Sequence, residues 1–249
     1  MLPSAARIAL ACLDLTSLGD ADTPAIVAAL ARRAHTPYGA PVAVCVHPEL
    51  IFAARLSLMR EGIAHVRVAT AINFPEGALD EAHCVAQTRR AIAVGADEIE
   101  LVFPWRAFLA GEKRAAKALV ERVKAHCTKA ELKVVLPGTA FANADDLHEA
   151  AMLAIKAGAD FLQTATGSTG AALCMASPAI ISAIRATTRP IGLKIAGGFS
   201  TLAEMHACIT LASELYGRDR VVPARFRLGA ETLSDELLTA LAADPVDES

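Results

Sequence analysis

The chain has 249 residues, of which 54% are hydrophobic and 20% charged, and it carries a formal net charge of −3 at pH 7. It is rich enough in apolar residues to bury a sizeable core, and it lacks the basic field that would attract nucleic acid or an anionic membrane surface. No apolar run approaches the roughly 20 residues that span a bilayer, and the six cysteines are scattered without a C-x-x-C pair. We therefore expect a cytoplasmic protein with no metal site and no nucleic-acid or membrane partner.

Short β-rich runs recur along the chain, and helical patterns separate them. The predicted strands are Ala11–Leu15, Val42–Val46, Val66–Thr70, Glu98–Phe103, Lys133–Leu136, Asp160–Thr164, Ile191–Ile195 and Ala224–Leu228. The predicted helices are Pro24–Arg33, Leu50–Glu61, Glu81–Val94, Glu112–His126, Ala144–Lys156, Pro178–Ala186, Leu202–Leu215 and Asp235–Leu241. Capping residues support two of the helix starts, since Thr23 precedes Pro24 and Asn143 precedes an acidic first turn.

Eight strands that alternate with helices over about 250 residues predict an α/β fold, a single (β/α)8 TIM barrel formed by one domain, residues 1–249. A doubly wound open sheet is the alternative. That fold is disfavoured because no G-x-G-x-x-G follows the first strand.

The barrel interpretation places the functional site at the C-terminal ends of the strands. Alternate residues of a strand point inward, so Lys194, flanked by Leu193 and Ile195, is predicted to face the upper barrel interior. Glu98 and Glu100 share one face of their strand for the same reason. A structural Glu–Lys pair explains this pattern at least as well as a catalytic pair, but the position of both charges near strand ends favours function.

Glycines follow the sixth, seventh and eighth strands, at Gly167, Gly197, Gly198 and Gly229. Loops after the last strands of such barrels often bind phosphate through backbone N–H groups. Each glycine taken singly is better explained as a turn residue. Their clustering on adjacent loops predicts a ligand-binding site.

Seven stretches together resemble one enzyme family: Leu13–Leu18 (LDLTSL), Ala43–Pro48 (AVCVHP), Ile72–Gly77 (INFPEG), Gly95–Gly111 (GADEIELVFPWRAFLAG), Gly158–Gly167 (GADFLQTATG), Gly192–Gly198 (GLKIAGG) and Arg227–Leu233 (RLGAETL). The chain resembles the class I deoxyribose-phosphate aldolases over nearly the whole span from Leu13 to Leu241. The resemblance implies a lyase of deoxyribonucleotide catabolism that cleaves 2-deoxyribose 5-phosphate to acetaldehyde and glyceraldehyde 3-phosphate. It further implies a lysine Schiff base, no metal or other cofactor, a small-molecule carbonyl or sugar substrate, and a homodimer.

The resemblance also assigns catalytic positions. The family's Schiff-base lysine falls on Gln163, its second lysine on Lys194 and its proton-transfer aspartate on Glu100. Asp14, at the end of the first predicted strand, is expected at the barrel mouth, bonded to a lysine or to substrate. Because an amide nitrogen has no available lone pair, Gln163 cannot form an imine, and we expect Lys194 to have lost the cationic neighbour that would lower its pKa.

The predicted substrate-binding residues are Thr164, Thr166, Gly167, Gly197, Gly198, Gly229 and Ala230. In the same loops Ser168 and Ser200 stand where the family has cations, and Glu231 stands where it has serine. The glycines whose backbone N–H groups could bind phosphate are kept, but the two lost cations and the added carboxylate of Glu231 disfavour a phosphate dianion. Glu231 has a structural alternative, because an acidic residue also suits the start of the last helix.

Three hypotheses follow. The first is a working lyase with the nucleophile moved to Lys194, which Glu100 would hold protonated; at a pKa near 10.4 about one lysine in two thousand is neutral at pH 7. The second is a reaction on an unphosphorylated carbonyl substrate without an imine, in which Gln163, Thr164, Lys194 and Glu100 polarise a carbonyl and move a proton. The third is a binding or regulatory homologue that is not an enzyme.

Overall fold

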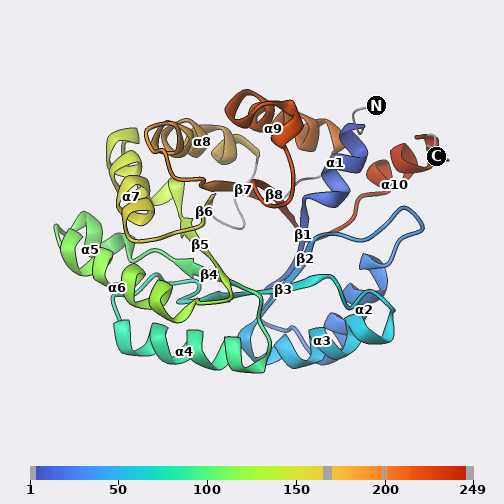
Figure 1. The fold of residues 1–249 in the computed structure, drawn as a ribbon, viewed down its shortest axis with the longest axis horizontal. Coiled ribbons are helices and arrows are strands. Elements are labelled where there is room, and N and C mark those ends of the chain that lie inside the picture. The colour runs from blue at the N-terminus through green and yellow to red at the C-terminus, as the bar shows by residue number, and fades with distance from the viewer. Residues whose placement is uncertain (1–3, 165–169, 198, 200, 245–249) are drawn as a thin grey trace.

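The computed structural model describes residues 4–164, 170–197, 199 and 201–244, with the side chains of residues 170–177 left aside. Its centre is a closed barrel of parallel strands in the order β1 to β8, with β8 pairing back onto β1 (Figure 1). The strands are β1 Leu13–Ser17, β2 Ala43–Val46, β3 Arg67–Ile72, β4 Glu98–Val102, β5 Glu131–Leu136, β6 Phe161–Thr164, β7 Gly192–Ala196 and β8 Phe226–Ala230. The predicted TIM barrel is confirmed.

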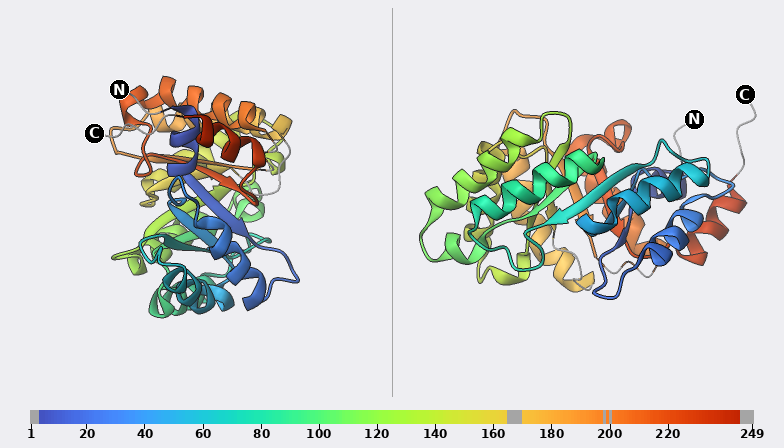
Figure 2. Two further views of the ribbon diagram at one scale, coloured as in Figure 1. Left: turned by 90° about the vertical axis from the view of Figure 1, so that its right-hand side faces the viewer. Right: turned by 90° about the horizontal axis from the view of Figure 1, so that it is seen from below.

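Helices surround the barrel on its outer side (Figures 1 and 2). They are α1 Ala5–Ala11, α2 Pro24–Ala34, α3 Ile51–Arg60, α4 Glu81–Val94, α5 Trp105–Leu109, α6 Lys113–His126, α7 Ala144–Lys156, α8 Gly170–Arg185, α9 Leu202–Tyr216 and α10 Asp235–Ala243. Short 3-10 turns lie at η1 Pro48–Leu50, η2 Gly138–Ala140 and η3 Arg218–Arg220. Both ends of the described chain lie beside α1 and α10, where Arg7 forms an ion pair with Asp244. None of the described helices is long and apolar enough to cross a membrane.

Local sequence explains where the helices begin. The side chains of Thr23 and Asn143 cap α2 and α7, as predicted. Thr201 and Glu204 form a reciprocal capping box at the start of α9. At the other end of α4, Gly95 adopts a left-handed conformation with φ 113°, which a residue without a Cβ adopts at little cost.

Alternation along each strand separates two environments. One set of side chains faces the helices and forms the main hydrophobic core, as Leu193, Ile195, Ile99 and Leu101 do. The other set faces the barrel interior, where charged side chains lie among small apolar residues, the amide of Gln163 and the ring of Phe161, which Lys133 and Arg227 contact. The sequence pattern therefore builds an apolar shell around a polar centre, and this centre contains the candidate site.

The predicted elements differ from the structure at a few places. The N-terminal apolar stretch contains α1, which was not predicted, and β1 starts two residues later than expected. As a result Asp14 is the second residue of its strand rather than near its end. The helix before β7 starts at Gly170, not at Pro178. The segment after β4 contains a short additional helix, α5.

Candidate active site

The barrel interior contains six charged side chains that are at most 1% exposed. They are the carboxylates of Asp14, Glu98 and Glu100 and the cations of Lys133, Lys194 and Arg227. Three negative and three positive charges sum to zero. That balance is what allows so many charges to be buried, because an unpaired buried charge is strongly destabilising.

Lys194 is held between two carboxylates. Its Nζ lies 2.5 Å from Glu100 Oε1 and 3.0 Å from Asp14 Oδ2. The predicted placement of Lys194 and Glu100 inside the barrel is thus confirmed, and their contact is direct. Asp14 does bond to a lysine as expected, but it lies inside the barrel rather than at its mouth, since β1 continues to Ser17.

Lys133 on β5 is a site residue that was not predicted. Its Nζ lies 2.5 Å from Asp14 Oδ2, 2.6 Å from Glu98 Oε2 and 3.4 Å from Glu100 Oε1. Two of these carboxylates also bind Lys194, so the two ammonium groups are close neighbours. The expectation that Lys194 has no cationic neighbour is therefore wrong. Lys133 opens the predicted fifth strand, where a lysine is easily taken for an exposed strand-end residue.

Gln163 lies in register with Lys194 on the adjacent strand and is fully buried. Its Nε2 donates a hydrogen bond of 2.9 Å to Glu100 Oε2. Its Oε1 is buried and has no hydrogen-bond partner among the described residues. A buried carbonyl oxygen without a partner is costly, so this atom is an unused hydrogen-bond acceptor of the site.

The electrostatics favour charged forms throughout. Burial alone would raise the pKa of Asp14 and of Glu100, but Lys133 and Lys194 outweigh it and hold both pKa values below their ordinary range. Burial alone would lower the pKa of Lys194, but Asp14 and Glu100 outweigh it and raise that pKa. The pKa of Lys133 is likewise lowered by burial but raised overall by Asp14 and Glu98, although the charge of Lys194 opposes this rise. The carboxylates around Lys194 thus favour its ammonium form.

Toward the N-terminal ends of the strands, two arginines bind the carboxylates of the network. Arg227 binds Asp14 Oδ1 at 2.7 Å and Glu98 Oε1 at 2.8 Å. Arg67 binds Glu98 Oε1 at 3.0 Å and reaches Glu131 at 2.9 Å near the N-terminal ends of the strands. In such barrels this end serves stability more than chemistry. We therefore regard the arginine layer as the support that fixes Asp14 and Glu98.

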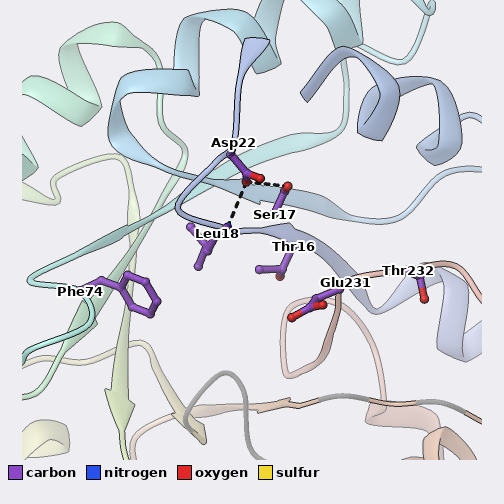
Figure 3. Close-up of a pocket in the computed structure, with 8 residues that line it drawn as sticks. Thr16, Ser17, Leu18, Asp22, Phe74, Glu231 and Thr232 are labelled. Carbon is purple, nitrogen blue, oxygen red and sulfur yellow. Dashed lines mark hydrogen bonds between the residues drawn. The ribbon is translucent and has the colours of Figure 1, made fainter. Parts of the chain in front are cut away.

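A cavity of about 420 Å³ opens at the C-terminal ends of the strands. Thr16, which shares a face of β1 with Asp14, lies at its wall. In Figure 3, Phe74 and Glu231 approach the cavity from two sides, and Asp22 is held by Ser17. The remaining described residues that line it are Ser17, Leu18, Gly19 and Thr232. The described lining therefore contains two carboxylates and no lysine or arginine.

Of the other residues predicted to bind substrate, some lie in the described part of the chain and some lie outside it. Thr164 is buried, and its hydroxyl bridges the N–H and C=O of Ala196 at 2.9 and 3.2 Å, so it ties β6 to β7. Gly197 donates its N–H to the carbonyl of Gly229 at 3.2 Å, and Ala230 ends β8. Their substrate-binding roles stay predictions. Thr166, Gly167, Gly198, Ser168 and Ser200 lie outside the described residues.

Gly229 is required by the position of Lys194. A Cβ at this residue would lie 2.8 Å from the Cβ of Ala196 and 3.0 Å from the Cε of Lys194. The missing side chain leaves room for the lysine to cross the barrel toward Glu100. Gly229 therefore acts on the site through packing, whether or not its backbone binds a ligand.

Comparison with known proteins matches residues 8–214 to the model of the DeoC/LacD family aldolases. The chain belongs to this aldolase family. It is 37% identical over 240 residues to a deoxyribose-phosphate aldolase of Agrobacterium fabrum, covering 96% of this chain and 92% of that protein. The predicted resemblance is thereby confirmed at the level of this aldolase family.

Solved structures agree. A crystal structure from Toxoplasma gondii ME49, described as a candidate deoxyribose-phosphate aldolase, is similar with a TM-score of 0.84 and 29% identity, covering 96% of this chain and 93% of that one. The tetrameric deoxyribose phosphate aldolase of Aeropyrum pernix matches with a TM-score of 0.67 at 18% identity, covering 96% and 92% of the two chains. At that identity the second likeness concerns the fold alone.

Proposed function

We propose that this member of the aldolase family acts on a small, unphosphorylated hydroxycarbonyl compound by proton transfer, without forming an imine. The observation that carries the proposal is the ammonium of Lys194, held between Glu100 and Asp14 beside the amide of Gln163. Resemblance places Gln163 at the family's Schiff-base position, and an amide cannot attack a carbonyl. A protonated lysine cannot attack one either, because its lone pair is occupied by a proton.

The same groups suit noncovalent carbonyl chemistry. Lys194 would donate a hydrogen bond to the carbonyl oxygen of the substrate, and the free Oε1 of Gln163 would accept one from a substrate hydroxyl. Glu100 would take the proton from the carbon beside the carbonyl. The C–H electrons would then form a C=C bond, and the carbonyl electrons would move to the oxygen, facing the Lys194 ammonium.

Two further points complete the proposed reaction. Once the substrate oxygen takes the hydrogen bond of Lys194, Glu100 loses a partner and becomes a stronger base. The proton then returns to the carbon and restores the carbonyl. Aldol cleavage gives an enolate at the same place when Glu100 takes the proton of a β-hydroxyl: the O–H electrons form the carbonyl of the departing aldehyde, the C–C bond electrons form the C=C bond, and the carbonyl electrons move to the oxygen that faces Lys194. The proposal therefore covers both proton exchange and cleavage at one site.

The charge of the cavity supports an unphosphorylated substrate. Asp22 and Glu231 are the charged groups among its described lining residues. A carboxylate at ~4–6 Å from a phosphate group is repulsive by about a kcal/mol or more. A neutral sugar or hydroxyaldehyde meets no such barrier, and its hydroxyl groups can bind to the threonine and serine side chains.

A second candidate is cleavage of 2-deoxyribose 5-phosphate through an imine on Lys194. The observation that favours it is Lys133, a second ammonium close to Lys194, because a like charge lowers the pKa of a neighbouring amine. The three carboxylates oppose this effect. In the closed network they hold both lysines protonated, so we place this candidate second.

The test is to measure exchange of α-protons for deuterium, and aldol cleavage, by NMR in D2O. The substrates are acetaldehyde, 2-deoxyribose and 2-deoxyribose 5-phosphate. We expect exchange or cleavage with the unphosphorylated compounds that is lost in Lys194→Met and Glu100→Gln and kept in Lys117→Met, a surface control on α6. Borohydride added during turnover should leave the mass of the protein unchanged. An adduct on Lys194 at pH 7 would support the imine candidate instead, and no turnover of any compound would support a non-enzymatic homologue.

A further inference from the structure

A second cavity lies at the opposite end of the barrel. It has a volume of about 410 Å³ and is built from the segments that lead into β7 and β8 and from the C-terminal ends of α8 and α9. These two helices lie side by side on the outside of β7 and β8 (Figure 1). A volume in this range suits a small molecule.

Four arginines line this basic pocket: Arg185, Arg189, Arg220 and Arg225. No aspartate or glutamate is among the described lining residues. Within the described part of the chain, none of the four guanidinium groups forms an ion pair with a carboxylate. Four cations around one hollow that have no carboxylate partner among the described residues are unexpected in a chain whose net charge is −3.

The walls of the basic pocket are fixed. Arg189 donates hydrogen bonds to the carbonyl of Ile155 in the last turn of α7 and to that of Ala159 in the turn before β6. Tyr216 donates its hydroxyl to the carbonyl of Ile191 at 3.0 Å. The loop before β7 is thus anchored to α7 and α9, so the cavity is formed before a ligand arrives.

Helix termini explain only part of this arrangement. A cation is favoured at the C-terminus of a helix, which accounts for Arg185 in the last turn of α8 and for the bonds of Arg189. It does not account for Arg220, in the three-residue turn η3, or for Arg225, in the loop before β8. These two residues come from other segments and face the same hollow.

We propose that the basic pocket binds a small molecule with two or more phosphate charges. Planar guanidinium groups bind phosphate oxygens in pairs, and several of them around one cavity suit a diphosphate better than a single carboxylate. Apolar side chains of Ile184, Pro190 and Leu215 also line the cavity and can pack against the uncharged part of such a ligand. The site is separate from the barrel mouth and does not depend on the function proposed there.

The test uses inorganic pyrophosphate as the probe, titrated by calorimetry into the full chain at low and at moderate salt. We expect one pyrophosphate per chain and weaker binding as salt rises. Arg220→Gln/Arg225→Gln should weaken binding at least tenfold. The matched control is Arg32→Gln/Arg33→Gln, which removes the same charge from the exposed end of α2 and should change the affinity less than twofold.

Three outcomes would overturn the proposal. They are no heat of binding at millimolar pyrophosphate, an equal loss in both double variants, and binding that survives Arg220→Gln/Arg225→Gln, which would place the anion elsewhere. A single-stranded oligonucleotide is titrated in parallel, because tight binding of that probe without pyrophosphate binding would indicate a polyanion surface instead. Circular dichroism of each variant verifies that it is folded.

Discussion

Lys133 and Lys194 converge on one oxygen atom of Asp14, with their Nζ atoms 2.5 and 3.0 Å from Oδ2. Two ammonium groups so close together are tolerated because Glu98 and Glu100 take up the remaining charge. Each carboxylate in turn binds more than one cation. A change of one charge anywhere in this network therefore affects every other member.

The first prediction concerns stability. Lys133→Met keeps an unbranched side chain that is one atom shorter but leaves three buried carboxylates with one fewer cation. We expect a loss of about 3–5 kcal/mol in the free energy of unfolding, the usual effect of breaking a buried ion pair, measured by urea unfolding. The control is Lys117→Met, which removes an exposed i,i+4 pair with Glu121 and should cost under about 1 kcal/mol. Equal losses in the two variants would contradict a stabilising role of the network.

The second prediction concerns pH. The pKa values of Asp14, Glu98 and Glu100 are lowered by folding. Their stabilising contribution is complete above the unfolded values of about 3.9 and 4.3 and is lost as pH falls through the folded-state values. The pKa values of Lys133 and Lys194 are raised, so their contribution is present below about pH 10.4 and is lost as pH rises through the folded-state values.

Stability should therefore form a plateau between about pH 5 and pH 10 and fall on both sides. Urea unfolding at intervals from pH 2 to pH 12 measures it. A free energy of unfolding that stays constant from pH 7 down to pH 2 would show that the buried carboxylates are not stabilised as ions.

The third prediction tests the packing around Lys194. Gly229→Ala adds a Cβ that meets both Ala196 and Lys194, and such overpacking costs about 1–3 kcal/mol. We expect a lower melting temperature and lower turnover in the exchange assay, because the displaced lysine leaves Glu100. Combining it with Ala196→Gly should relieve one of the two clashes and recover part of the lost stability, but not turnover. Full recovery of turnover in the double variant would mean that the lysine contact is unimportant.

The fourth prediction concerns the cavity charge. The native chain should bind 2-deoxyribose 5-phosphate no better than 2-deoxyribose. Glu231→Gln should improve binding of the phosphate ester roughly fivefold, corresponding to the removal of about 1 kcal/mol of repulsion. Calorimetry gives both affinities. Glu214→Gln removes the same charge on α9, away from the cavity, and should leave the affinities as they are. A marked preference of the native chain for the phosphate ester would contradict the proposed substrate class.

Much of the fold could be predicted from the sequence because the outward-facing residues of the strands are so regular. In β4 and β7 every second residue is a large apolar one that packs on helices, which made Glu98, Glu100 and Lys194 stand out on the opposite face. The errors fell where this periodicity is weak. Small residues dominate α1, so its pattern does not indicate a helix, and the predicted first strand starts at Ala11 rather than at Leu13. Asp14 is then expected near the end of the strand, at the mouth of the barrel, and not in its interior.

Lys133 could not be recognised as readily. A lysine at the start of a predicted strand has the pattern of an exposed residue. Lys133 is buried because the strands close into a barrel around it. β5 begins two residues earlier, at Glu131, which places Lys133 inside. Its three carboxylate partners lie on β1 and β4, so only the three-dimensional arrangement reveals the charge balance. The likeness to deoxyribose-phosphate aldolases located Gln163, Lys194 and its partner Glu100, but not Lys133, the second ammonium group beside Lys194.

The last prediction concerns Gln163→Lys. This change puts a fourth cation among three buried carboxylates, and the amide's hydrogen bond to Glu100 is replaced by competition between ammonium groups. One lysine should then lose its proton near neutral pH, because burial and like charge both lower a lysine pKa. We expect acetaldehyde and borohydride to produce an adduct at pH 7 at least ten times more abundantly than in the native chain.

Peptide mapping of that adduct shows whether position 163 or Lys194 is the nucleophile, and Gln163→Met serves as the control that removes the amide without adding an amine. In the native chain any trapping should rise with pH as Lys194 deprotonates. Strong trapping of the native chain at pH 7 would show that the carboxylates do not hold Lys194 as an ammonium ion. An absence of trapping in Gln163→Lys at every pH would show that the site differs from imine-forming aldolases in more than this residue.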